Sequence, residues 1–172
     1  MSRALRTQDE LVQALKLAGR QLSTATILFH QAVADRLGLN LTDHKCVDLL
    51  LLNGPLTAGE LAALTALTTG AITAALDRLE RAGFVRREDD PEDRRRVVVR
   101  AVPQRVSEMS RLFDSFSARL DEFFTGYKDE ELALLVDFMT KSCDVLHKST
   151  EELRQGPTTA GKKKSGRAKG KG

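Results

Sequence analysis

The chain has 172 residues, of which 41% are hydrophobic, 30% are charged and 5% are aromatic, with no tryptophan. This length suits a single domain with a core of its own. No uninterrupted apolar run approaches the ~20 residues that a membrane helix needs, and residues 1–10 lack the apolar segment of a secretory signal. We therefore expect a cytoplasmic protein without a membrane partner.

The net charge of +3 is unevenly distributed. Residues 156–172 hold six of the 27 lysines and arginines and no acid, which leaves 21 basic residues against 24 acidic ones in the rest of the chain. Any nucleic-acid footprint on the folded part must therefore be local. The Gly, Lys and Thr-rich composition of residues 156–172 predicts a disordered tail.

Catalytic and metal-binding patterns are not found in the sequence. The three histidines are scattered over separate segments, and no Ser-His-Asp order, H-E-x-x-H motif or glycine-rich phosphate loop occurs. Cys46 and Cys143 lie far apart and belong to no C-x-x-C pair, which favours two buried thiols over a disulfide, a zinc site or a redox switch. We expect no cofactor, no metal and no enzymatic activity.

The first elements are predicted from helical periodicity and capping residues. Apolar residues recur in steps of three and four from Leu11 to Phe29, which predicts a helix over 9–37 that Gly38 ends. Thr42 is expected to cap a short helix that ends at Leu52, before the helix-breaking residues 53–55. Thr57 and Glu60 match a capping box, which predicts a helix over 58–64.

A second short helix follows at once. A turn over 67–70 leads into a helix that reaches Arg81, with Ile72, Ala75, Leu76 and Leu79 on its buried side. Residues 84–88 and 97–102 read as two strands joined by a charged hairpin loop. Two short helices joined by a tight turn and followed by such a hairpin predict a winged helix-turn-helix.

Helical periodicity returns after Pro103. A heptad-type seam in one helix is predicted from Val106, Met109, Phe113, Phe116, Leu120 and Phe123. Gly126 ends that helix, and a last helix is expected over 129–154. These long amphipathic helices exceed what a winged helix needs, and a homodimer would cover their apolar sides.

The predicted fold is thus mostly α with a small β-wing. Residues 1–40 form an N-terminal dimerisation helix, 41–103 a winged helix-turn-helix DNA-binding lobe, 104–155 the C-terminal dimerisation helices and 156–172 the lysine-rich tail.

DNA contact is predicted for two segments of the central lobe. The outer face of the second short helix carries small residues near its start, where a recognition helix approaches base edges. Its candidate contacts are Thr68, Thr69, Gly70, Thr73, Ala74 and Arg78. The hairpin loop adds three consecutive arginines, Arg94, Arg95 and Arg96. At least one of them should project outward, because strand side chains alternate in direction, and it could enter a narrow minor groove.

The stretch L-T-T-G-A-I-T-A-A-L-D-R-L-E-R-A-G-F-V-R-R (67–87), followed by D-P-E-D-R-R-R (90–96), resembles the MarR family of bacterial transcription regulators. The resemblance implies a homodimer with two winged helices that acts, commonly as a repressor, on a palindromic operator. It also implies release by a small-molecule effector or an oxidant, although the sequence identifies no ligand. In the family's wing motif, Asp93 and Arg95 brace the loop, which leaves Arg94 and Arg96 as groove contacts.

Two other interpretations remain open at this stage. The chain could be a helical dimerisation or scaffold protein whose hairpin binds a protein partner. It could also be an architectural protein that uses the basic tail to bind DNA without sequence preference. Salt-dependent binding that an operator competes for would favour the regulator.

Overall fold

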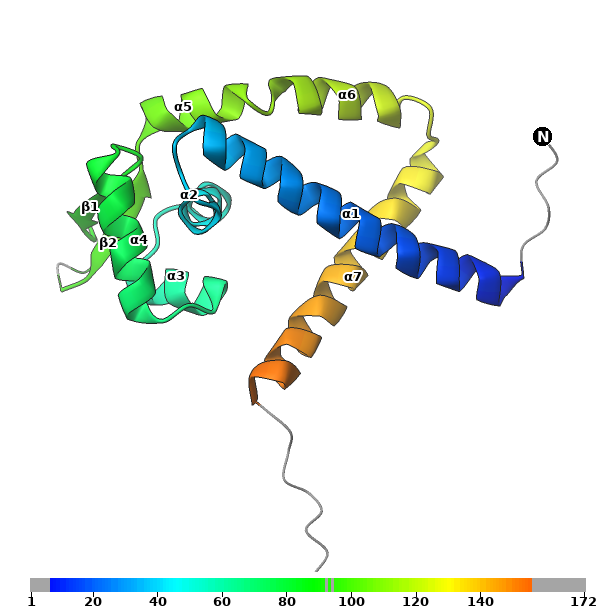
Figure 1. Cartoon of the computed structure of the whole chain (residues 1–172), viewed down its shortest axis with the longest axis horizontal. Helices are drawn as coiled ribbons and strands as arrows, with labels where there is room; N and C mark the ends of the chain where they lie inside the picture. The colour runs from blue at the N-terminus through cyan, green and yellow to red at the C-terminus, as the bar shows by residue number, and fades with distance from the viewer. Residues whose placement is uncertain (1–6, 92, 94, 156–172) are drawn as a thin grey trace, which may run out of the picture. The chain divides into compact units, whose positions relative to one another are not determined.

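A computed structural model describes residues 7–91, 93 and 95–155 of the chain, and Figure 1 shows their elements. They divide into two compact units, one that ends at Ser117 and one that begins at Ala118. The first unit contains α1 (Gln8–Arg36), α2 (Leu41–Asn53), α3 (Ala58–Thr65), α4 (Thr69–Arg81), β1 (Val85–Asp89), β2 (Val97–Ala101) and α5 (Pro103–Arg111). Helix α6 (Asp114–Phe124) crosses the division, and α7 (Asp129–Gln155) lies in the second unit. The predicted fold class, helical with a small β-wing, is confirmed.

Side-chain caps start α1, α2, α3 and α4. Thr57 and Glu60 form the predicted capping box of α3, and the hydroxyl of Thr68 accepts a hydrogen bond from the Ala71 backbone N–H at the start of α4. The cap predicted for α2 was wrong. Asn40, not Thr42, caps that helix, and its Oδ1 atom accepts from the Asp43 N–H at 2.8 Å. Both residue types make good caps, so residue type alone did not distinguish them.

The core of the first unit lies where α2, α3 and α4 pack against the hairpin. The side of α4 that was predicted to be apolar is buried, as is Leu61 of α3, and Phe84 closes the core after α4. Its largest fully buried side chains include Leu61, Ile72, Leu76, Leu79, Val47 and Val99. Burying each such side chain contributes about 1.5–3 kcal/mol relative to leaving it in water. Because one side of α4 is buried in this core, its opposite, outer face is held in a fixed position.

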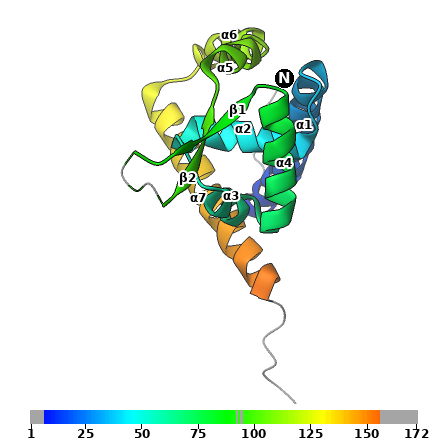
Figure 2. The same cartoon turned by 90° about the vertical axis from the view of Figure 1, so that its left-hand side faces the viewer.

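The two strands form an antiparallel hairpin in which Val85 pairs with Ala101 and Asp89 with Val97. Leu56 makes an isolated bridge with Val99 on the other side of β2, through two backbone hydrogen bonds of 3.2 and 2.7 Å. In Figure 2 the hairpin extends beyond α2, α3 and α4. The pairing thus anchors the base of the wing and leaves its tip exposed.

The prediction of a single helix after Pro103 was wrong in one respect. The structure interrupts it at Leu112 and Phe113, between α5 and α6. The backbone N–H groups of these two residues donate to carbonyls three residues back, Met109 and Ser110, which tightens the turn there. Phe113 packs against the core. A heptad pattern constrains which side is apolar, and it does not require the helix to stay regular.

The predicted seam residues differ in burial within one protomer. Met109 is buried, at 3% exposure, and Phe113 is half-buried, whereas Phe116 and Phe123 are 42% and 58% exposed. Val106 and Leu120 are half-buried. Their predicted place at a subunit contact stays a prediction.

Helix α7 has apolar residues on two of its sides. At 100° per residue, one side carries Leu132, Val136, Met139, Cys143 and Leu146, and another carries Leu134, Phe138 and Val145. All of them except Leu132 are exposed. Among the residues described, no single helix is long and apolar enough to cross a membrane, and α3 with α4 passes that test only as a pair bent by 113°.

Candidate nucleic-acid interface

The outer face of α4 consists of small side chains in its first turns. The residues predicted from the sequence, Thr68, Thr69, Gly70, Thr73 and Ala74, are all exposed. A Cβ atom added to Gly70 would meet no heavy atom within 4 Å. A surface can therefore approach this part of the helix closely, as base edges in a major groove would.

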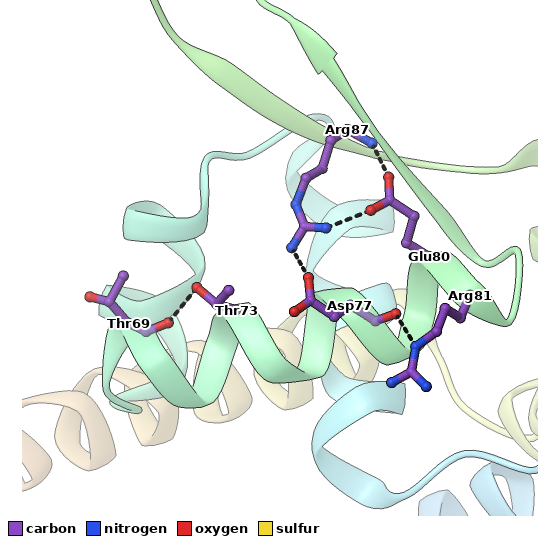
Figure 3. A network of polar contacts seen from close by, with 6 residues as sticks. All are labelled: Thr69, Thr73, Asp77, Glu80, Arg81 and Arg87. Carbon is purple, nitrogen blue, oxygen red and sulfur yellow. Dashed lines mark hydrogen bonds and ion pairs between the residues drawn. The ribbon is translucent and has the colours of Figure 1, made fainter.

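The hydroxyl group of Thr73 donates a hydrogen bond to the backbone of its own helix. Its Oγ1 atom donates to the Thr69 carbonyl at 2.9 Å, as Figure 3 shows. The side chain is therefore left with a methyl group and the acceptor lone pairs of the oxygen to offer to a ligand.

Arg78, the one basic residue among the predicted contacts of α4, is bound to another helix. Its Nε and Nη2 atoms donate to the two carboxylate oxygens of Asp43 on α2, at 2.9 and 2.6 Å. Asp43 is only 2% exposed, whereas the Arg78 side chain is 42% exposed. The hydrogen bonds to Asp43 raise the pKa of Arg78. Arg78 thus ties α4 to α2, and no partner of its Nη1 atom is found in the described part of the chain.

An open hollow lies beside this ion pair, between the start of α2 and α4. Its volume is about 490 Å³. It is lined by Asn40, Leu41, Thr42, Leu67, Ala71, Ala74 and Arg78. Arg78 is the only charged residue among those that line the hollow, so the hollow gives access to the outer face of α4 beside a single cation.

A second set of ion pairs fixes α4 to the wing. Arg87 on β1 donates to Asp77 at 2.7 Å and to Glu80 on α4, and its backbone N–H also donates to Glu80, at 3.0 Å (Figure 3). Together with the pair between Arg78 and Asp43, these contacts use every charged member of the D-R-L-E segment at 77–80. The fourth member, Leu79, is buried in the core. This part of the stretch that carries the resemblance is therefore structural.

The predicted bracing of the wing by Asp93 is made through the backbone. Its carboxylate accepts from the Arg95 N–H at 3.0 Å, and its carbonyl accepts from the Arg96 N–H at 2.8 Å. The Arg95 side chain is exposed and takes no part in this bracing. Arg94 lies outside the described residues, as does the tail at 156–172.

Arg96, predicted as a groove contact, is paired within the chain. Its guanidinium lies 3.1 Å from Glu60 on α3 and 3.9 Å from Asp90 in the hairpin. Glu60 also caps α3, and its hydrogen bonds to Thr57, followed by the charge of Arg96, lower the pKa of Glu60. The pair is largely exposed, so a DNA phosphate could compete for Arg96.

Aromatic rings gather where α1, α2 and the break between α5 and α6 meet. His44 is 1% exposed, its ring centroid lies 5.2 Å from that of His30 and 6.4 Å from that of Phe113, and its Nε2 atom has no hydrogen-bond partner among the described residues. Burial, followed by the charge of His30, lowers the pKa of His44. Within the described residues, no group of three or more His, Cys, Asp or Glu is placed to hold a metal ion.

The two thiols differ in exposure. Cys46 is buried, and burial followed by the charge of Asp43 raises its pKa to about 11. Cys143 is exposed, against the prediction of two buried thiols, because it lies on a side of α7 that this protomer leaves uncovered.

Sequence reasoning did not find the residues that support the interface. Asp43, Glu60 and Arg87 bind partners on other elements, and two of these pairs join residues more than 30 positions apart. In the sequence, these pairs are marked only by the opposite charges of their two members. Many exposed residues carry such charges, so charge alone does not identify a pair.

The fold and the interface can now be compared with known proteins. Residues 39–97 match the model of the MarR family. The uncharacterized HTH-type transcriptional regulator YcgE of Bacillus subtilis (strain 168) is 43% identical over 149 residues, which cover 87% of this chain and 97% of YcgE. The chain belongs to the MarR family. It is a MarR-family transcriptional regulator, as the resemblance in its sequence predicted.

One further relative and two solved structures are similar to this MarR-family protein. YkoM, an uncharacterized HTH-type transcriptional regulator of the same strain, is 28% identical over 105 residues, covering 61% of this chain and 68% of YkoM. A MarR family protein from Bacillus stearothermophilus has a TM-score of 0.65 at 20% identity, over 83% of this chain and 99% of that one. Apo wild-type MarR from E. coli has a TM-score of 0.53 at 19% identity, over 81% and 98%. These two structures share the fold.

Proposed function

We propose that this MarR-family protein binds double-stranded DNA as a homodimer and reads an inverted-repeat operator. The observation that carries the proposal is the outer face of α4. It is small, exposed and uncharged in its first turns, and it is fixed from behind by the core and in its C-terminal half by ion pairs to α2 and β1. Rigid support is what a recognition helix needs, because a loosely held helix gives up free energy to be ordered on binding.

The homodimer is supported by the apolar residues that one protomer leaves uncovered. MarR-family regulators bind DNA and act as dimers. Along α1, residues such as Leu15, Leu22 and Leu28 are 54–65% exposed, and α7 has apolar residues on two sides. Exposed apolar area on this scale marks an interface. A second copy of the chain that packs against these helices would place two α4 helices on one side of a duplex.

The wing and the tail are proposed to add contacts of two kinds. Arg95 and Arg96, with Arg94, would meet the minor groove beside each half-site. The six basic residues of 156–172 would add attraction to phosphates that does not depend on sequence. Action as a repressor that a small-molecule effector releases would follow from the resemblance to the family.

The test is a selection of bound duplexes from a random-sequence library by the full chain. We expect enriched sites with dyad symmetry, because a two-fold dimer reads two half-sites ~10 bp apart. Competition at several salt concentrations then compares an enriched site with a scrambled duplex of the same composition. Enriched sites without dyad symmetry would contradict the dimeric arrangement, and equal affinity for both duplexes would favour the architectural alternative.

A further inference from the structure

We infer that α4 reads thymine methyl groups, so that the operator half-sites carry thymines where Thr73 and Ala74 meet the major groove. The inference rests on the proposed DNA-binding function and adds the class of base that the helix recognises. It follows from which side chains of α4 are still able to contact a base.

The long donor side chains of α4 lie beyond its first two turns. Guanine and adenine are distinguished best by bidentate contacts from Arg, Lys, Asn or Gln. The sequence has none of these residue types between Thr68 and Asp77. Arg78 holds Asp43 with two of its nitrogen atoms, and Arg81 donates to the carbonyl of Asp77 at 3.1 Å. The first two turns of α4 therefore offer no fork-shaped donor to a purine.

Methyl groups are the main groups that Thr73 and Ala74 present to a ligand. Thr73 gives its only hydroxyl hydrogen to the Thr69 carbonyl, and Ala74 has no polar atom in its side chain. Both are exposed, and Ala74 also lines the open hollow. In the major groove, the 5-methyl group of thymine is the apolar feature that Thr and Ala side chains contact.

Gly70 allows the approach that such short side chains require. Gly70 precedes Ala74 by one helical turn, and the space around its Cα is open. A methyl group reaches about one bond beyond the backbone, so contact with a base needs the helix deep in the groove. Gly70→Ala would fill that space without a clash inside the protein. It should raise thermal stability slightly, because alanine favours a helix over glycine, and it should lower operator affinity.

The deciding experiment replaces thymine by uracil, which removes only the 5-methyl group. Each thymine of the selected operator is replaced in both half-sites, and the affinity of the full chain is measured for every duplex. We expect about a fourfold loss for each methyl contact, by the usual value of a buried methyl group. Thr73→Ser removes the protein methyl group and keeps the hydroxyl. It should lower affinity for the thymine duplex and abolish the difference between thymine and uracil at one position.

Thr26→Ser is the matched control. Thr26 on α1 is also exposed, and its hydroxyl makes the same kind of bond to the Leu22 carbonyl at 2.9 Å. This variant should leave the difference between thymine and uracil duplexes unchanged, because any effect through the proposed dimer contact of α1 is the same for every duplex.

The outcomes separate the two proposals. A chain that binds no duplex, or binds all duplexes equally, would overturn the proposed function itself. Selected sites in which uracil replaces every thymine without loss would overturn the present inference alone. The inference also fails if 7-deazaguanine, which removes one guanine acceptor, weakens binding more than uracil does at any position.

Discussion

The carboxylate of Asp43 is almost fully buried, and its cationic partner is Arg78 on another helix. The two residues are unequal in exposure, so we predict that removing them has unequal costs. Arg78→Ala leaves a buried charge without a partner and should lower the free energy of unfolding by about 2–3 kcal/mol. Asp43→Asn leaves a partly exposed guanidinium that water can solvate, and it should cost less. Denaturant unfolding of both variants measures the difference.

The double variant, Asp43→Asn with Arg78→Met, is the control for this pair. It removes both charges and should recover part of the stability lost in Arg78→Ala, because no buried charge remains. Equal losses in the two single variants, with no recovery in the double variant, would contradict the assignment.

His44 gives the fold a dependence on pH. Burial and the neighbouring His30 and Lys45 lower its pKa, whereas Asp48 opposes them. The folded state therefore favours the neutral ring, and the unfolded chain takes up a proton first as the pH falls below 6.5. The contribution of His44 to the free energy of unfolding should be fully present above pH 6.5 and should decrease below it. Denaturant unfolding from pH 5 to 8 should show this decrease in the wild type.

His44→Phe should flatten that pH dependence, even if it changes stability at every pH. His147→Gln is the control, because it replaces an exposed histidine of α7. Parallel curves for the wild type and His44→Phe would assign the acid sensitivity to other groups.

At the scale of elements, the wing is held to α3 by the pair between Arg96 and Glu60. If DNA competes for Arg96, removal of the Glu60 charge should raise affinity. Glu60→Gln keeps a capping-box residue type, so stability should change little. We expect duplex affinity to rise by about twofold to fivefold, the range of an exposed ion pair. Gel-shift titration at fixed salt measures it.

The gain must depend on Arg96 to support this explanation. In a chain that carries Arg96→Ala, Glu60→Gln should raise affinity much less. A gain of the same size in both backgrounds would mean that Glu60 acts only by repelling phosphates.

Local elements were predictable because their determinants are local. The alternation of buried and exposed positions in α4, and the spacing of Thr57 and Glu60, depend on residues within one or two turns. The small residues on the outer face of α4 followed from the same periodicity, and the structure leaves them exposed as predicted.

The rest depended on contacts between distant residues. Nothing near Arg78 in the sequence shows that its partner is Asp43, and nothing near Arg96 shows that Glu60 competes for it. The break at Leu112 and Phe113 also escaped prediction, because the apolar spacing continues across it. In each case tertiary contacts chose among arrangements that the local sequence allowed equally.

At the scale of the whole molecule, the prediction concerns the dimer. Phe116 is 42% exposed in one protomer, with its ring centroid 4.9 Å from that of Phe29. If a second copy completes its burial, Phe116→Ala should cost roughly 3–5 kcal/mol. It should also lower operator affinity, because the two half-sites are read together. Sedimentation over a range of protein concentrations measures the dimer directly.

Leu52→Ala serves as the comparison, since Leu52 is 72% exposed on α2 and is not part of the predicted seam. It should leave the sedimentation profile unchanged. A wild-type chain that sediments as a monomer at micromolar concentration would contradict the prediction.

The ion pairs around the D-R-L-E segment have a consequence for how the specificity of this lobe can change. The side chains that hold α4 in place point to α2 and β1, and those that face outward at positions 69, 70, 73 and 74 have no support role. Support and recognition are therefore carried by separate sets of positions on the same helix. A library randomised at these four outward positions should contain many folded regulators with new operator preferences, whereas one randomised at 77–80 should contain few that fold at all.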